Sequence, residues 1–101
     1  MESYLKQQRR YVREQVLEEG TLTLTGKAPL PVDILDVSFD QTQGEVRGFG
    51  LLTPTLLAPK KECVLRLPVS NYAGAYLCET VYSQDIGLGY RSGLSVQQKL
   101  K

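Results

Sequence analysis

Two groups of side chains have the types and spacing of a site that binds an anionic ligand. Arg9 and Arg13 lie four positions apart, with Arg10 between them. Asp36 and Ser38 follow later in the chain, separated by one residue. The planar fork of arginine matches the paired oxygens of a phosphate and the O6/N7 edge of guanine. If the fold brings the two groups together, they predict a site for a doubly charged guanine nucleotide.

Both groups also have an ordinary structural explanation. Clusters of Lys and Arg are common on protein surfaces, so Arg9, Arg10 and Arg13 alone are typical of a solvated basic arm. Arg10 can have a structural role or make a second contact with a ligand. Asp36 and Ser38 can form an Asx or serine turn at the end of a strand, and such a turn is compatible with ligand binding.

The composition indicates one small globular domain. The chain has 101 residues, of which 42% are hydrophobic and 23% are charged, and a chain of this length buries one modest core. Its net charge of +1 supplies no general field that would attract nucleic acid or a membrane surface. Positive charge is concentrated in residues 1–13, where four basic residues accompany a single acid, Glu2.

The residue types favour a binding module over an enzyme. The chain has no histidine, which removes the commonest general base and the commonest metal ligand. The sequence also lacks a nucleophile elbow, a phosphate-binding glycine loop and a cluster of acids at metal-ligand spacing. We therefore expect a protein that is not an enzyme and holds neither a metal nor a cofactor.

The sequence predicts a cytoplasmic protein that does not insert into a membrane. No apolar run approaches the ~20 residues that span a bilayer, and the first residues have no apolar core of a signal peptide. In that compartment Cys63 and Cys78 are expected to be reduced thiols of two strands, and a disulfide is the less favoured alternative.

Hydrophobic alternation predicts six strands and no long helix. Residues 1–13 lack this alternation and are predicted to be a flexible or short helical basic arm, followed by a barrel domain over residues 14–101. The loop 40–46 is polar. The predicted strands are 21–25, 31–39, 47–53, 63–69, 75–82 and 90–96. Six short strands joined by turns favour a small antiparallel barrel or sandwich, and closure into a barrel removes exposed sheet edges.

The second predicted strand carries one half of the candidate site. Because side chains alternate along a strand, Asp36 and Ser38 are expected to share a face. The same rule puts Ile34 on one face of this strand and Val37 on the other.

The order of these motifs resembles the PilZ domains of bacteria. Arg9 and Arg13 match the Arg-x-x-x-Arg pattern that precedes the first strand of that family. Asp36 and Ser38 match the start of its Asp/Asn-x-Ser-x-x-Gly pattern, which ends the second strand. The resemblance extends over residues 9–96, and the segments similar to later strands are 48–52 (GFGLL), 63–69 and 90–94 (YRSGL).

The resemblance implies a six-stranded barrel that binds cyclic di-GMP, a bacterial second messenger, without catalysing a reaction. It assigns ligand binding to Arg9, Arg13, Asp36, Ser38 and a glycine. The family has this glycine where Gln41 stands here, so Gly48 takes its role if residues 40–46 are an inserted loop. Arg10 and Arg47 are additional candidate contacts.

Three functions follow from these expectations. In the first, ligand binding orders the arginine arm and relays the second-messenger level to a bacterial partner protein, with the protein acting alone or as a homodimer. In the second, a degenerate PilZ-like adaptor binds no nucleotide and acts by protein contact in pilus, flagellar or exopolysaccharide machinery. The third, binding of single-stranded nucleic acid, is disfavoured by the low net charge.

Overall fold

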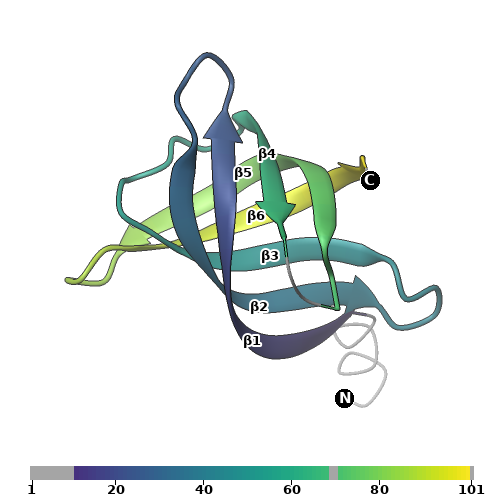
Figure 1. Cartoon of the computed structure of the whole chain (residues 1–101). Helices are drawn as coiled ribbons and strands as arrows, with labels where there is room; N and C mark the ends of the chain where they lie inside the picture. The colour runs from purple at the N-terminus through teal and green to yellow at the C-terminus, as the bar shows by residue number, and fades with distance from the viewer. Residues whose placement is uncertain (1–10, 69–70, 101) are drawn as a thin grey trace.

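The six predicted strands form and close into a barrel (Figure 1). The computed structural model describes residues 11–68 and 71–100, and its strands are β1 (Tyr11–Leu24), β2 (Leu30–Asp40), β3 (Val46–Thr53), β4 (Glu62–Leu67), β5 (Gly74–Asp85) and β6 (Tyr90–Lys99). They are hydrogen-bonded in the order β1-β2-β3-β6-β5-β4, and every pairing is antiparallel. These observations confirm the prediction of an all-β, six-stranded antiparallel barrel.

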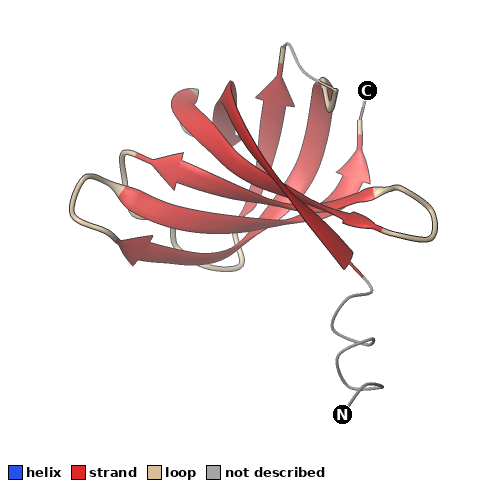
Figure 2. Ribbon diagram, turned by 90° about the horizontal axis from the view of Figure 1, so that it is seen from below, coloured by secondary structure: helices blue, strands red, loops and turns tan. Residues whose placement is uncertain are grey.

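Strands and their connections make up the described part of the chain, as Figure 2 shows. None of the described residues forms a helix that is long and apolar enough to cross a membrane. The predicted flexible or short helical conformation of the arm concerns mainly residues 1–10, which lie outside the described residues.

The first strand begins earlier than predicted. The alternation places its start at Thr21, whereas β1 begins at Tyr11, so the last three residues of the predicted arm are strand. The predicted start is wrong because this half of β1 pairs with β2 through its backbone and exposes polar side chains such as Arg13. A bulge between Gln15 and Glu18 also interrupts the two-residue period on which the prediction rests.

A second bulge changes which side chains of β2 face the core. The β2–β3 register shifts between Ile34 and Asp36, so Leu35 is an extra residue. Ile34 and Val37 are both fully buried, and the prediction that they lie on opposite faces is wrong because one extra residue shifts the phase of the alternation. Beyond the bulge, Asp36 and Ser38 lie on the outer face together, as predicted.

The interior of the barrel is apolar. Its buried cluster comprises Leu22, Val32, Ile34, Val37, Phe49, Leu51, Leu57, Cys63, Leu65, Leu67, Tyr76, Cys78 and Leu94. The rings of Phe49 and Tyr76 meet edge to face with centroids 4.9 Å apart, a favourable aromatic geometry. Leu57 comes from the loop between β3 and β4. The next residue in this loop, Ala58, accepts a hydrogen bond at its carbonyl from Thr80 Oγ1 at 2.5 Å. The core therefore includes one loop as well as all six strands.

Two ladders, β1–β4 and β3–β6, join strands that are not consecutive in the sequence, and each ladder covers only part of its strands. The β1–β4 ladder joins residues 21–24 to residues 63–66, and the β3–β6 ladder begins at the pair Gly48–Ser95 and ends at Thr53–Tyr90. β6 continues beyond this ladder to Lys99, paired with β5. β3 and β6 therefore separate beyond Ser95, toward Lys99.

Cys63 and Cys78 are paired residues of β4 and β5, and both are free thiols in the core. The prediction of two reduced thiols is therefore confirmed. Burial raises the pKa of Cys63 from 9.0 to about 11 and that of Cys78 from 9.0 to about 12, because a thiolate is poorly solvated there. The folded state therefore favours the protonated form of both thiols.

We predict that the two thiols make the fold sensitive to alkali. The folded thiols hold their protons above pH 9, whereas the unfolded thiols release them, so the free energy of unfolding falls as the pH rises from about 9 through about 11 to 12. Denaturant unfolding at successive pH values measures this fall. A Cys63→Ala/Cys78→Ala variant should lose the slope between pH 9 and 10, and an unchanged slope would contradict the explanation.

Candidate functional site on the outer face of the barrel

Cross-strand pairing brings four of the predicted ligand-binding residues onto one outer face. Arg13 pairs with Ser38 across β1 and β2, and Ser38 pairs with Gly48 across β2 and β3. Asp36 lies in the neighbouring row, paired with Gly50. A shallow cavity of about 130 Å³ is lined by Arg13, Asp36, Ser38, Gly48, Phe49, Gly50, Val81, Tyr82, Gly93 and Leu94. The closed sheet thus assembles these residues from five strands.

The carboxylate of Asp36 lies against the backbone of Gly50 and forms an ion pair. A Cβ atom at residue 50 would stand 2.5 Å from Asp36 Oδ1, so the carboxylate occupies the space that Gly50 leaves open. Arg91 Nη2 donates to Asp36 Oδ2 at 2.6 Å. This hydrogen bond raises the pKa of Arg91. Asp36 is 6% exposed, so its charge is largely buried and compensated by Arg91.

Arg91 is the exposed partner of this pair. Its side chain is 34% exposed, against 9% for the side chain of Asp36. A guanidinium has five N–H donors, and only one of its terminal nitrogens contacts Asp36. Arg91 also has a side-chain hydrogen bond with Tyr82, and the donors that neither partner engages can meet an anion or a base edge on the outer face.

Beside the ion pair, a second glycine makes room for an aromatic ring. Gly93 pairs with Gly50 across β6 and β3. A Cβ atom at residue 93 would overlap the ring of Tyr82, which lies against the glycine backbone and remains 44% exposed. Gly50 and Gly93 therefore let the carboxylate of Asp36 and the ring of Tyr82 lie against the backbone of the sheet.

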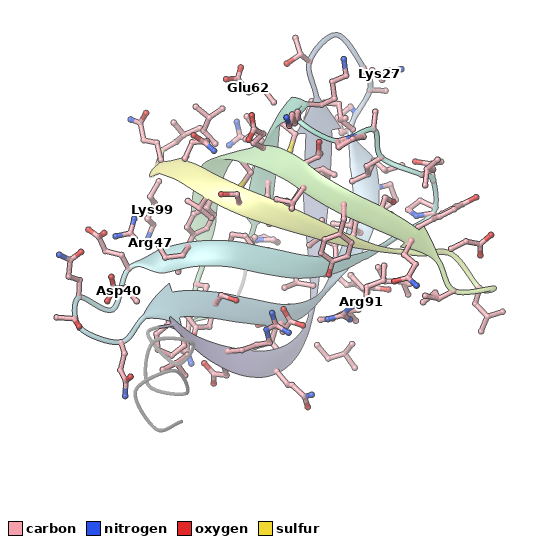
Figure 3. The ribbon with its side chains drawn as sticks, turned by 180° about the vertical axis from the view of Figure 1, so that it is seen from behind. Lys27, Asp40, Arg47, Glu62, Arg91 and Lys99 are labelled. Carbon is pink, nitrogen blue, oxygen red and sulfur yellow. The ribbon has the colours of Figure 1, made fainter. Side chains whose placement is uncertain are left out.

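The cavity continues along the sheet toward the β2–β3 hairpin. A second cavity of about 380 Å³ is lined by Ser38, Arg47, Gly48, Leu94, Ser95 and Val96. It shares Ser38, Gly48 and Leu94 with the first cavity. We call the two together the outer groove. Arg91 and Arg47 lie toward opposite ends of β3 in Figure 3.

Arg47, predicted as an additional contact, is held by the hairpin that precedes it. Its Nη2 atom lies 3.1 Å from Glu45 Oε1, 3.7 Å from Asp40 Oδ2 and 3.4 Å from Gln43 Oε1. The side chains of Arg47 and Glu45 are 42% and 62% exposed, so water weakens this pairing. An anion in the outer groove can compete for the same guanidinium.

Arg9 and Arg10 lie outside the described residues. Their position along the chain is nevertheless informative, because Tyr11, the first described residue, pairs with Asp40 at the end of β2. The arm therefore joins the barrel beside the hairpin end of the outer groove.

Arg91, Tyr82 and Gly93 complete the face, and the sequence did not identify them as site residues. Arg91 is 55 positions from Asp36, so no local motif connects the two. The glycines at 48, 50 and 93 are the sequence feature that could have indicated this face, because glycine within a strand often marks the close approach of another group. At Gly50 the group that approaches is the carboxylate of Asp36.

Compared with models of protein families, with curated proteins and with solved structures, the chain matches none. The PilZ resemblance thus stays a prediction that rests on the residues named above. Among residues 11–68 and 71–100, no three His, Cys, Asp or Glu side chains are grouped so that they could hold a metal ion.

We predict that Gly50→Ala destabilises the barrel through Asp36 alone. The added methyl group overlaps the carboxylate, and overpacking of this kind costs about 1–3 kcal/mol. In an Asp36→Ala background the same substitution should cost at least about 1 kcal/mol less, since the overlapping atoms are gone. Urea unfolding of the wild type, both single variants and the double variant measures the difference. Equal costs in the two backgrounds would show that Gly50 serves the backbone instead.

Proposed function

We propose that the protein binds cyclic di-GMP in the outer groove and relays the level of this second messenger to a partner protein. The observation that carries the proposal is the convergence of Arg13, Asp36, Ser38 and Gly48 on one face of the barrel. The PilZ resemblance names these residues for ligand binding, and the fold required to unite them is a closed antiparallel barrel.

The chemistry of the groove suits a ligand with two phosphates and two guanines. Arg13 lines the groove, Arg91 contacts the lining residue Asp36, and Arg47 lies at the far end. Each guanidinium can bind a phosphate or the O6/N7 edge of guanine, and can also stack on a base. Gly48, which carries no side chain, lets the backbone of β3 approach the ligand closely.

In this proposal the role of Asp36 differs from the direct ligand contact that the resemblance implies. Its carboxylate is buried beneath Arg91 and already accepts a hydrogen bond from it. We propose that Asp36 orients Arg91, and that Arg91 makes the contact with the ligand. Ser38, which is less buried and lies in the row of Arg13, remains available to a phosphate or a base.

The arm supplies the relay in this proposal. The two cavities of the groove are open and shallow, with volumes of about 130 and 380 Å³, whereas sites for ligands of this size commonly enclose most of the ligand. Arg9 and Arg10 belong to a segment that joins the barrel at the groove. Closure of this segment over the ligand would complete the site and change the surface offered to a partner.

The remaining parts of the proposal follow from the identity of the ligand. Cyclic di-GMP is a bacterial cytoplasmic messenger, so we place the protein in the bacterial cytoplasm. It acts there through a bacterial partner protein, alone or as a homodimer, without catalysis, cofactor, metal or nucleic acid.

A second candidate is an adaptor that binds no nucleotide. The ion pair between Asp36 and Arg91 favours it, because the carboxylate of the expected ligand motif is already satisfied within the protein. Such an adaptor would act by protein contact in pilus, flagellar or exopolysaccharide machinery. Capture of the same partners by the wild type and an Arg13→Ala variant, with or without cyclic di-GMP, would support the adaptor over the receptor.

We predict that calorimetric titration with cyclic di-GMP detects binding to the wild type. Arg13→Ala and Arg91→Ala should each weaken the affinity by about tenfold or more, because each removes charge-assisted hydrogen bonds. Arg66→Ala is the matched control, since Arg66 is exposed on β4, a strand that contributes no residue to the outer groove. Absence of heat at high micromolar ligand would exclude the receptor function.

A full effect of Arg91→Ala has to be separated from loss of the fold. Arg91→Lys keeps a charge beside Asp36 but loses the planar fork, so it should preserve the unfolding temperature better than the affinity. If both variants bind as tightly as the wild type while Arg13→Ala does not, Arg91 is structural and the proposed orienting part of Asp36 is wrong.

A further inference from the structure

The barrel leaves one edge of β6 uncovered near its end. The β3–β6 ladder begins at the pair Gly48–Ser95, and beyond it β6 runs through Val96–Lys99 with only β5 as a partner among the described strands. A bulge at Arg47 turns β3 away, because the β2–β3 register skips that residue. β3 and β6 diverge toward Arg47 and Lys99 in Figure 3.

A cleft lies beside this edge. Its volume is about 530 Å³, and its lining includes Glu45 and Arg47 on the hairpin side and Gln97 and Lys99 on β6. The hairpin and the end of β6 lie on the same side of the barrel in Figure 1. The cleft is thus bounded by a strand edge on one side and a turn on the other.

Two tyrosines form the inner surface of the cleft. Tyr76 is 1% exposed, and its hydroxyl donates to the carbonyl of Tyr72 at 2.7 Å. The hydroxyl of Tyr72 donates to the carboxylate of Glu14, and its ring lies 6.4 Å from that of Phe39. These contacts fix the partly exposed ring of Tyr72, against which an inserted side chain can pack.

The backbone of β6 presents hydrogen-bonding groups to the cleft. The N–H of Leu100 donates to the carbonyl of Ala75 on β5 at 2.7 Å. Alternate residues of a strand direct their N–H and C=O groups to opposite neighbours, so the N–H of Lys99 points away from β5. An edge of this kind is a template for an added strand.

We propose that an extended acidic segment of a partner protein docks in this cleft as an additional strand beside residues 96–99. Charge favours an acidic segment, because residues 96–99 of β6 carry one base, Lys99, and no acid. In the lining of the cleft, Arg47 and Lys99 outnumber Glu45, which already contacts Arg47.

A second copy of the chain fits the edge less well. Antiparallel pairing of two β6 ends would bring together like charges from Lys99 of each copy, an unfavourable arrangement. Each copy would also bring its own β2–β3 hairpin to the same narrow space, because that hairpin flanks the edge. A single strand without an attached sheet avoids both problems.

The test is titration of the isotope-labelled full chain with short blocked peptides, followed by the amide signals in NMR spectra. The probe is Ac-(Asp-Val)₃-NH₂, and its matched controls are Ac-(Lys-Val)₃-NH₂ and an acidic peptide methylated on alternate backbone nitrogens. We expect the acidic probe to shift and protect the amide of Lys99, and the two controls to bind at least tenfold more weakly. Equal binding of the methylated peptide, signals that move elsewhere, or no binding of the acidic probe would overturn the proposal.

Two variants separate the edge from general charge. Lys99→Pro removes the outward N–H and should abolish binding, while Lys99→Glu should weaken it at least tenfold. Lys27→Glu makes the same charge change in the β1–β2 turn, where Figure 3 shows it far from Lys99, and should bind as the wild type does. Unfolding curves check that all three variants fold. Concentration-dependent dimerisation that Lys99→Pro abolishes would overturn the proposal in favour of a second copy.

Discussion

The outer face of the barrel depends on one buried carboxylate. Asp36 is almost inaccessible to water, and a buried charge without a partner is strongly destabilising. Arg91 has to reach it from β6, and residue 50 has to be glycine for the carboxylate to lie between β2 and β6. The pair therefore ties together three adjacent strands and determines which groups the face presents.

Small residues across the same strands follow from this arrangement. Side chains at 50 and 93 would displace Asp36 and Tyr82, and a side chain at 48 would approach the carbonyl of Leu94 to 2.9 Å. The side chains of Asp36 and Tyr82 consequently lie close to the sheet, with arginines at the margins. Such a surface is flat and rich in donors, which suits planar anionic molecules better than globular partners.

The sequence predicted the strands well and the side-chain environment only in part. Alternation found all six strands because each buries one face, but it missed the first half of β1, where polar side chains are exposed. It placed Ile34 and Val37 on opposite faces, since an extra residue such as Leu35 leaves no mark on composition. Arg91 could not be found, because its partner lies 55 positions away and only the closed fold brings them together.

The bulge at Arg47 puts its side chain in the linings of both the outer groove and the cleft beside β6. A guanidinium that turns toward an occupant of one is withdrawn from the other, together with the hairpin acids that now hold it. If both proposed occupants bind, their binding free energies are therefore coupled through Arg47. Thermodynamic linkage then requires each to change the affinity of the other by the same factor.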